Sequence, residues 1–241
     1  MLAGIVVINL ERRPDRLRQV LRLLAGSDIS AVPTYRLSAH DGSKIEYKNG
    51  LLTEQAVREL DALRITRLRN FHAQLSLGAI GCYLSHLDAW KFIADTAAAA
   101  GNMEAPYLIL EDDANIPASC MVQLSEGWQL SAAQSAGKPF MLLGHIICLS
   151  SCSRRADGLI TPDRFWSFQA YILNGRTAAT LLAAGMMPMD VQIDSQVLYF
   201  RNAGLLDIYA YDIMDNAHMD TDIQMNIRTG APLDRFMVFS P

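Results

Sequence analysis

Apolar runs and amphipathic stretches alternate along most of this sequence. Short runs rich in β-branched residues predict buried strands, and apolar residues three and four positions apart predict helices that bury one face. The expected strands are 4–10, 34–37, 107–110, 140–143, 165–173 and 205–211. The expected helices are 14–25, 54–68, 83–100, 125–136 and 176–184. This alternation predicts an α/β layer fold with a mixed, mostly parallel sheet flanked by helices and with ligands at the carboxyl ends of its strands.

Three carboxylates stand directly after the apolar strand 107–110. They are Glu111, Asp112 and Asp113. Carboxylates this close repel each other and lose hydration near a core, so a cation is expected to neutralise them. Hard oxygen ligands favour Mg²⁺ or Mn²⁺, and a site with few protein ligands leaves positions for phosphate oxygens. A solvated turn or a helix cap is the alternative interpretation, which the buried strand in front disfavours.

Composition limits the classes of protein to which the chain can belong. Of its 241 residues 51% are hydrophobic, which suits one large domain, or one domain with an added lobe. A formal net charge of −4 gives no electrostatic case for nucleic acid as a partner. No apolar run approaches the ~20 residues of a membrane span, so at most peripheral membrane contact is expected. Residues 1–10 lack the basic start and the cleavage site of a signal peptide, which predicts a cytoplasmic protein.

The cysteines show no paired spacing that would indicate a disulfide framework. They stand at positions 82, 120, 148 and 152. We expect all four to be reduced. A zinc site built from His145, Cys148 and Cys152 is disfavoured because Cys148 lies in the apolar run 142–149 and no second ligand pair follows.

Further candidate groups flank predicted helices. Gly78 and Gly81 open the helix 83–100, and a glycine-bearing turn into a helix can hold phosphate through free backbone N–H groups. His86 fits a hydrogen-bonded histidine at the edge of the core as well as a ligand contact. Asp190 and Asp194 are four residues apart and share one face if the segment is helical.

Six short stretches stand out in sequence order. They are 7–16, 39–42, 81–86 with Trp90, 110–113, 170–173 and 188–190. Together they resemble glycosyltransferase family 25, and the resemblance runs from Val7 to about Asp190. This family includes bacterial lipooligosaccharide galactosyltransferases and the collagen hydroxylysine galactosyltransferases.

The resemblance implies a GT-A fold, in one domain over 1–241. The donor-binding part would cover about 1–115 and the acceptor and catalytic part about 116–241. It also implies an inverting transfer of a sugar from a nucleotide-sugar donor, above all galactose from UDP-galactose. The expected acceptor is a hydroxyl of a glycan, a lipooligosaccharide or a hydroxylysine-type peptide, and the expected cofactor is Mn²⁺ or Mg²⁺.

Site roles follow from this implied reaction. Asp113, with Glu111 or Asp112 directly or through water, would hold the metal, and His218 late in the chain could complete the metal shell. Asp190 matches a family stretch and is the expected base, with Asp194 as substitute. The groups expected beside the nucleotide or in the donor pocket are Asn9, Leu10, Arg12, Arg13, Arg16, Ser85, His86 and Asp112.

Two other functions fit the same carboxylates. A metal-dependent nucleotidyltransferase or phosphohydrolase would turn over nucleoside triphosphates and not nucleotide sugars. A non-catalytic relative would bind nucleotide sugars without turnover, and the presence of both Asp113 and Asp190 argues against it.

Overall fold

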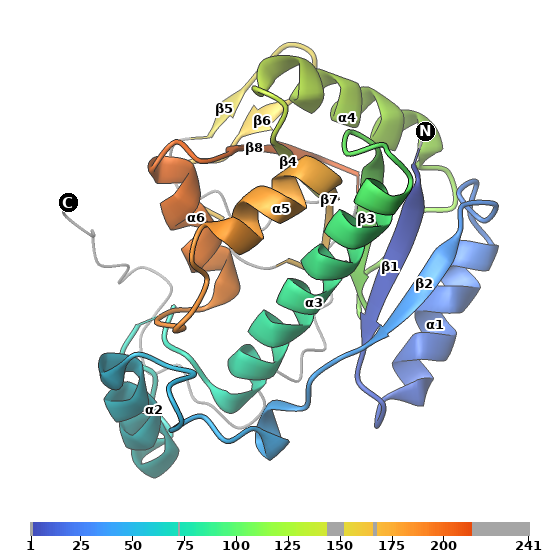
Figure 1. Ribbon diagram of the computed structural model, residues 1–241. Coiled ribbons are helices and arrows are strands. Elements are labelled where there is room, and N and C mark those ends of the chain that lie inside the picture. Colours follow the sequence, from blue (N-terminus) through green and yellow to red (C-terminus); the bar gives the residue numbers. More distant parts are fainter. Residues whose placement is uncertain (1, 72, 144–151, 166–167, 214–241) are drawn as a thin grey trace.

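The computed structural model describes residues 2–71, 73–143, 152–165 and 168–213, and these form one eight-stranded mixed sheet with helices on both faces (Figure 1). The strands are β1 (Gly4–Asn9), β2 (Thr34–Ser38), β3 (Pro106–Glu111), β4 (Pro139–Leu143), β5 (Ser153–Arg154), β6 (Ile160–Thr161), β7 (Ala170–Asn174) and β8 (Asp207–Tyr211). The helices are α1 (Pro14–Ala25), α2 (Glu54–Thr66), α3 (Leu77–Ala99), α4 (Met121–Gln134), α5 (Gly175–Ala183) and α6 (Ile193–Asn202), with a short 3₁₀ helix η1 (Gly42–Lys44). The predicted α/β class is confirmed.

The strand order is β2-β1-β3-β7-β4-β8-β6-β5. β1 is parallel to both β2 and β3, and β4 is parallel to β8, whereas β7 runs antiparallel between β3 and β4. Because β2 and β3 flank β1 on opposite sides, the chain reverses its direction of travel across the sheet here. Such a reversal opens a crevice at the carboxyl ends of the strands. The acidic end of β3 lies at that crevice.

Side chains of the central strands alternate between two cores. One face carries Ile5, Val7, Leu108 and Leu110, which pack with residues of α1 and α4. The other face carries Val6, Ile8, Tyr107 and Ile109, which pack with α2, α3, α5 and α6. Both faces are therefore covered, which explains why these strands are apolar throughout instead of alternating.

Helix α3 begins six residues earlier than the sequence indicates. Ser76 caps it by accepting a hydrogen bond from the amide of Ala79, and the helix runs from Leu77 to Ala99. Gly81 therefore lies inside the helix, where its missing side chain allows another backbone to approach. A Cβ atom on Gly81 would lie 2.4 Å from the carbonyl oxygen of His40, and one on Gly42 would lie 1.7 Å from that of Leu77.

Two other predictions need correction. In the stretch 165–173, predicted as one strand, the described residues form a strand from Ala170 onward, and the described stretch 152–164, for which no strand is predicted, contains the short strands β5 and β6. β6 pairs with β8, so this stretch extends the sheet. The reason is that backbone pairing with a neighbouring strand can order a polar stretch that has no apolar pattern of its own.

The expectation of four reduced cysteines is wrong. Cys152 is disulfide-bonded, whereas Cys82 and Cys120 carry free thiols. A disulfide requires two Cβ atoms close together in space and no particular sequence spacing. The disfavoured zinc trio loses Cys152 as a ligand for this reason, and its other two members lie outside the described residues.

Among the helices that the structure describes, none combines the length and the apolar composition that a membrane span requires.

The close approach at Gly81 predicts a stability loss for Gly81→Ala. Alanine favours a helix, but here its Cβ atom meets backbone, and such overpacking costs about 1–3 kcal/mol. Gly26→Ala is the matched control because the nearest atom to a Cβ there, the carbonyl oxygen of Arg22, would be 3.5 Å away. Urea unfolding of both variants measures the difference, and equal stabilities would contradict the packing argument.

Candidate active site

A cavity of about 180 Å³ lies where the carboxyl ends of β1 and β3 meet the first turns of α3. Eight of the residues predicted for the site line it: Leu10, Arg12, Arg16, Ser85, His86, Glu111, Asp112 and Asp113. The other lining residues are Ile8, Ala39, His40, Asp41, Gly42, Ser43, Leu77, Gly78 and Cys82. Of these, only Gly78 has a predicted role, in a turn that can hold phosphate. The stretch 39–42 is one of the six that carry the family resemblance, which by itself does not indicate that this stretch faces a ligand.

Asp112 is the buried and compensated member of the acidic group. Its Oδ2 accepts a hydrogen bond of 2.6 Å from Asn9 Nδ2, and its Oδ1 lies 3.4 Å from Arg16 Nη1. The register of β1 with β3 pairs Ile8 with Glu111, so Asn9 and Asp112 come next to each other. Burial raises the pKa of Asp112, and Asn9 and Arg16 act against that rise. Asp112 therefore ties β1, α1 and β3 together.

Asp113, unlike Asp112, is not compensated by neighbouring side chains. Its Oδ1 atom is buried and has no hydrogen-bond partner. Burial, and after it the charge of Glu111, raises the pKa of Asp113 to about 7. A buried carboxylate oxygen without a partner is costly, and a bound cation would remove the cost.

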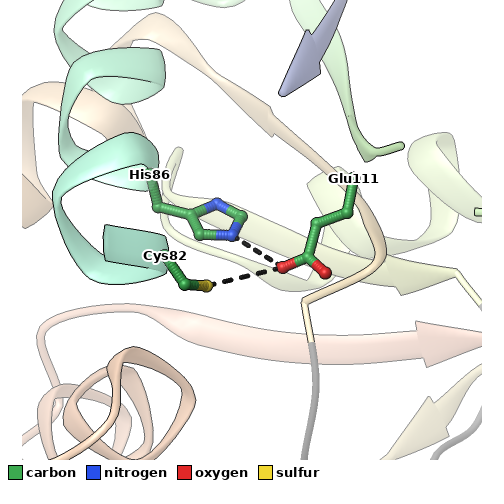
Figure 2. Close-up of side chains that lie close together, drawn as sticks. All are labelled: Cys82, His86 and Glu111. Atoms are coloured by element: carbon green, nitrogen blue, oxygen red, sulfur yellow. Dashed lines mark hydrogen bonds and ion pairs between the residues drawn. The ribbon is translucent and has the colours of Figure 1, made fainter. Parts of the chain in front are cut away.

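Glu111 belongs to a cluster with two side chains from α3 (Figure 2). Its Oε1 lies 3.1 Å from His86 Nε2 and 3.6 Å from Cys82 Sγ. Cys82 and His86 are one helical turn apart and so point from the same side of α3 toward the end of β3. Burial, followed by the charge of Glu111, holds the pKa of the Cys82 thiol well above its usual range.

A chain of hydrogen bonds fixes the ring of His86. Trp90 Nε1, which can only donate, gives a 2.8 Å hydrogen bond to the hydroxyl of Tyr171. That hydroxyl lies 2.8 Å from His86 Nδ1. If Tyr171 donates to Nδ1, the ring proton sits on Nε2 and faces Glu111. His86 is thus both a hydrogen-bonded core histidine and a residue of the cavity wall.

The segment 39–43 forms the cavity wall opposite the carboxylates, and hydrogen bonds of Ser85 and Asp41 hold it in place. The hydroxyl of Ser85 accepts from the amide of His40 at 2.9 Å, so it fixes this wall. Asp41 accepts from the hydroxyl and amide of Ser43 and pairs with Arg12 at 3.3 Å. The hydroxyl of Ser43 is the main cause of the lowered pKa of Asp41. Arg12 therefore presents its cationic side chain at the cavity rim.

Asn9 and Arg13 are not among the residues that line the cavity. Asn9 supports Asp112 and also donates to the carbonyl of Arg13 at 2.9 Å. Arg13 forms an ion pair with Asp15 at the start of α1. His218 lies outside the described residues.

Asp190 and Asp194 differ in their surroundings. Helix α6 begins at Ile193, so Asp190 precedes it and the two carboxylates do not share a helical face. Asp190 is exposed and accepts a hydrogen bond from Thr53, the N-terminal cap of α2. Asp194 is only 5% exposed, so it does not face solvent. Its Oδ1 accepts a 2.6 Å hydrogen bond from the amide of Ser195, which holds the carboxylate against the first turn of α6.

Arg69 is a buried cation for which the sequence gives no predicted role. None of its guanidinium nitrogens has a hydrogen-bond partner. Burial lowers the pKa of Arg69, and the negative charge of Asp194 opposes that shift. The same charge acts on the Cys82 thiol. Asp194 therefore links the buried Arg69 electrostatically to the acidic wall of the cavity.

The sheet and its crevice define an α/β protein with an acidic ligand pocket at a strand reversal, the class in which substrates bind at strand ends. The pattern described as Glycosyltransferase family 25 (LPS biosynthesis protein) matches residues 3–195, and the chain belongs to this family. It is therefore a glycosyltransferase, and the family implies a nucleotide-sugar donor. Comparison with curated proteins gives no match.

The raised pKa of Asp113 predicts how stability changes with pH in metal-free protein. In the unfolded chain this carboxyl titrates near pH ~4, and in the fold it titrates at about 7. Between these values the folded state keeps a proton that the unfolded chain releases, so stability falls as pH rises. In Asp113→Asn this fall should be smaller, which thermal unfolding with a chelator from acidic to neutral pH measures. Identical pH profiles for both proteins would refute the assignment.

Proposed function

We propose that this chain is an inverting, divalent-metal-dependent glycosyltransferase that moves galactose from UDP-galactose to a hydroxyl group. Glycosyl transfer rests on family membership, and the observation that carries metal dependence is the buried, unpartnered Oδ1 of Asp113 in the cavity. The family description supports a lipopolysaccharide-type glycan as acceptor. A hydroxylysine-type peptide is the alternative acceptor.

The residues present fit a hard divalent cation such as Mn²⁺ or Mg²⁺. Asp113 offers an unpartnered oxygen, and both contacts of Glu111 fall on Oε1, which leaves Oε2 for a ligand. Asp112 fits less well because Asn9 and Arg16 use its two oxygens. We therefore assign Asp113 and Glu111 as ligands and Asp112 as the residue that positions them. When bound, the ion would supply positive charge that stabilises the leaving diphosphate.

The donor-binding part is proposed to lie within 1–115. The cavity-lining residues all fall between Ile8 and Asp113. Leu77 and Gly78, in the first turn of α3, line the cavity, and the start of a helix favours negative charge such as a diphosphate. Arg12 at the rim adds a cation that can reach phosphate.

The acceptor side is proposed to use Asp190 as base. An inverting transfer requires a carboxylate that takes the proton of the acceptor hydroxyl as it attacks the sugar. Asp190 is exposed, so an arriving acceptor can reach it, and its bond to Thr53 fixes its orientation. Asp194 is buried and fits better as the charge that compensates Arg69. Asp194 remains the alternative base because its charge reaches the cavity wall.

A panel of nucleotide sugars tests the proposed activity. We expect metal-dependent hydrolysis or transfer with UDP-galactose, and none with nucleoside triphosphates. Turnover of triphosphates without turnover of nucleotide sugars would instead indicate a nucleotidyltransferase or a phosphohydrolase. Binding of nucleotide sugars without turnover, even when glycan acceptors are supplied, would indicate a non-catalytic relative.

Asp113→Ala should weaken Mn²⁺-dependent binding of UDP by more than about 10²-fold, since loss of a supporting contact to a metal ligand alone costs 10–100-fold. The fold should persist because the change also removes carboxylate repulsion. Titration calorimetry with UDP and Mn²⁺ measures the effect. Asp95→Ala is the control, because Asp95 is exposed on α3 and forms its ion pair with Lys91, away from the cavity residues. Unchanged UDP affinity in Asp113→Ala would argue against the metal role.

The base assignment is tested with Asp190→Asn and Asp194→Asn. Asparagine at 190 can still accept from Thr53 but cannot take a proton, so transfer should fall by ~10²–10⁴ while donor affinity is retained. Asp194→Asn should chiefly lower the free energy of unfolding, by roughly 1–3 kcal/mol, because Arg69 loses its compensating charge. Donor affinity, turnover and urea unfolding separate the two effects. A loss of transfer confined to Asp194→Asn would move the base to that residue.

A further inference from the structure

The geometry points to a second cation site in the cavity, formed by Cys82, His86 and Glu111, that binds a thiol-seeking divalent cation such as Zn²⁺. This ligand set differs from the pair of carboxylates proposed for Mn²⁺ or Mg²⁺, because it contains a sulfur and an imidazole nitrogen. Soft and borderline ligands of this kind select zinc over the hard cations.

The spacing of the three donor atoms supports the site. Sγ, Nε2 and a carboxylate oxygen all lie within 4.8 Å of one another. Bonds of about 2.3 Å to sulfur and about 2.0–2.1 Å to nitrogen and oxygen, in a tetrahedron, require separations of about 3.5 Å from sulfur to oxygen and about 3.4 Å from nitrogen to oxygen. The observed values from Oε1 of Glu111 are 3.6 Å to Cys82 Sγ and 3.1 Å to His86 Nε2. The two separations from Glu111 are therefore close to those that a shared ion requires.

The surroundings of His86 suit a metal ligand. A ligating histidine usually donates its other ring N–H to a fixed oxygen, which orients the ring. Here the hydroxyl oxygen of Tyr171 lies 2.8 Å from Nδ1, and it can accept from His86 as well as from Trp90. The imidazole ring also packs edge-on against Phe168, with ring centroids 5.5 Å apart. The ring keeps its position whichever nitrogen carries the proton.

The coordination shell would be open toward the cavity. Cys82, His86 and Glu111 all line it, and three protein ligands leave a fourth tetrahedral position for water or for an oxygen of a bound molecule. On binding, the Cys82 thiol releases its proton to solvent and the sulfur binds as thiolate, while the imidazole binds in its neutral form.

The two cation sites share Glu111, so they should exclude each other. Zinc bound to Cys82 and His86 withdraws Glu111 from Asp113, and it should inhibit Mn²⁺-dependent donor binding. This consequence rests on the proposed function, whereas the zinc site itself rests only on the geometry. The opposing interpretation is a cluster joined by hydrogen bonds that holds no metal.

Cobalt substitution tests the site without any nucleotide. Metal-free protein titrated with Co²⁺ should develop the near-ultraviolet charge-transfer band of a thiolate bound to cobalt. Cys82→Ser should lose the band and bind Zn²⁺ more than about 10²-fold more weakly in calorimetry, since even supporting contacts are worth 10–100-fold. Cys120→Ser is the matched control, because Cys120 also has a free thiol but hydrogen-bonds Asp28.

Two results would overturn the zinc site: no charge-transfer band in the wild-type protein, or a band that persists in Cys82→Ser. If Cys82→Ser does not fold, mass-spectrometric mapping of thiols in the wild type replaces it, and Zn²⁺ should then protect Cys82 from alkylation. An unprotected Cys82 would also overturn the site. Competition is measured separately, as the loss of Mn²⁺-dependent UDP binding when Zn²⁺ is added. Zinc binding without that loss would overturn the competition and leave the site in place.

Discussion

Three consecutive carboxylates crowded at the end of β3, one buried and two half-buried, are the constraint on which the rest of the site depends. The three carboxylates differ in their interaction partners. Asp112 is paired with Asn9 and Arg16, Glu111 contacts His86 and Cys82, and Asp113 keeps one buried oxygen without a partner. Ion pairing and hydrogen bonding thus compensate two of the charges internally. The third is left for something outside the chain.

Because Asp113 is left uncompensated, folding carries a free-energy cost that only a bound ligand removes. A protein selected for stability alone would pair Asp113 or replace it, since an unpartnered buried oxygen opposes folding. Violations of this kind are expected where a protein must bind or react. Asp113 lines the cavity, between two walls that are themselves fixed by hydrogen bonds. The uncompensated carboxylate therefore lies in surroundings that are held in place.

Close backbone packing gives the cavity its second wall. Gly42 and Gly81 let the segment 39–44 lie directly against the first turns of α3, and Ser85 fixes the backbone of His40. Larger side chains at either glycine would push this wall away from the carboxylates. Placement of the wall and placement of Cys82 and His86 both depend on α3, so one helix aligns the two sides of the cavity.

The sequence by itself determined the α/β alternation, the buried strand with its acidic end, and eight of the residues that line the cavity. These follow from local patterns, because the period of apolar residues reports which face of an element is buried. Only the tertiary structure decided which carboxylate is compensated, because Asn9 and Asp112 meet through strand register across 103 positions. Tertiary packing likewise buried Asp194 and Arg69, exposed Asp190, and brought Glu111 to the helical pair Cys82 and His86. Burial, exposure and pairing of these side chains depend on contacts between distant segments. The local spacing of apolar residues does not predict such contacts.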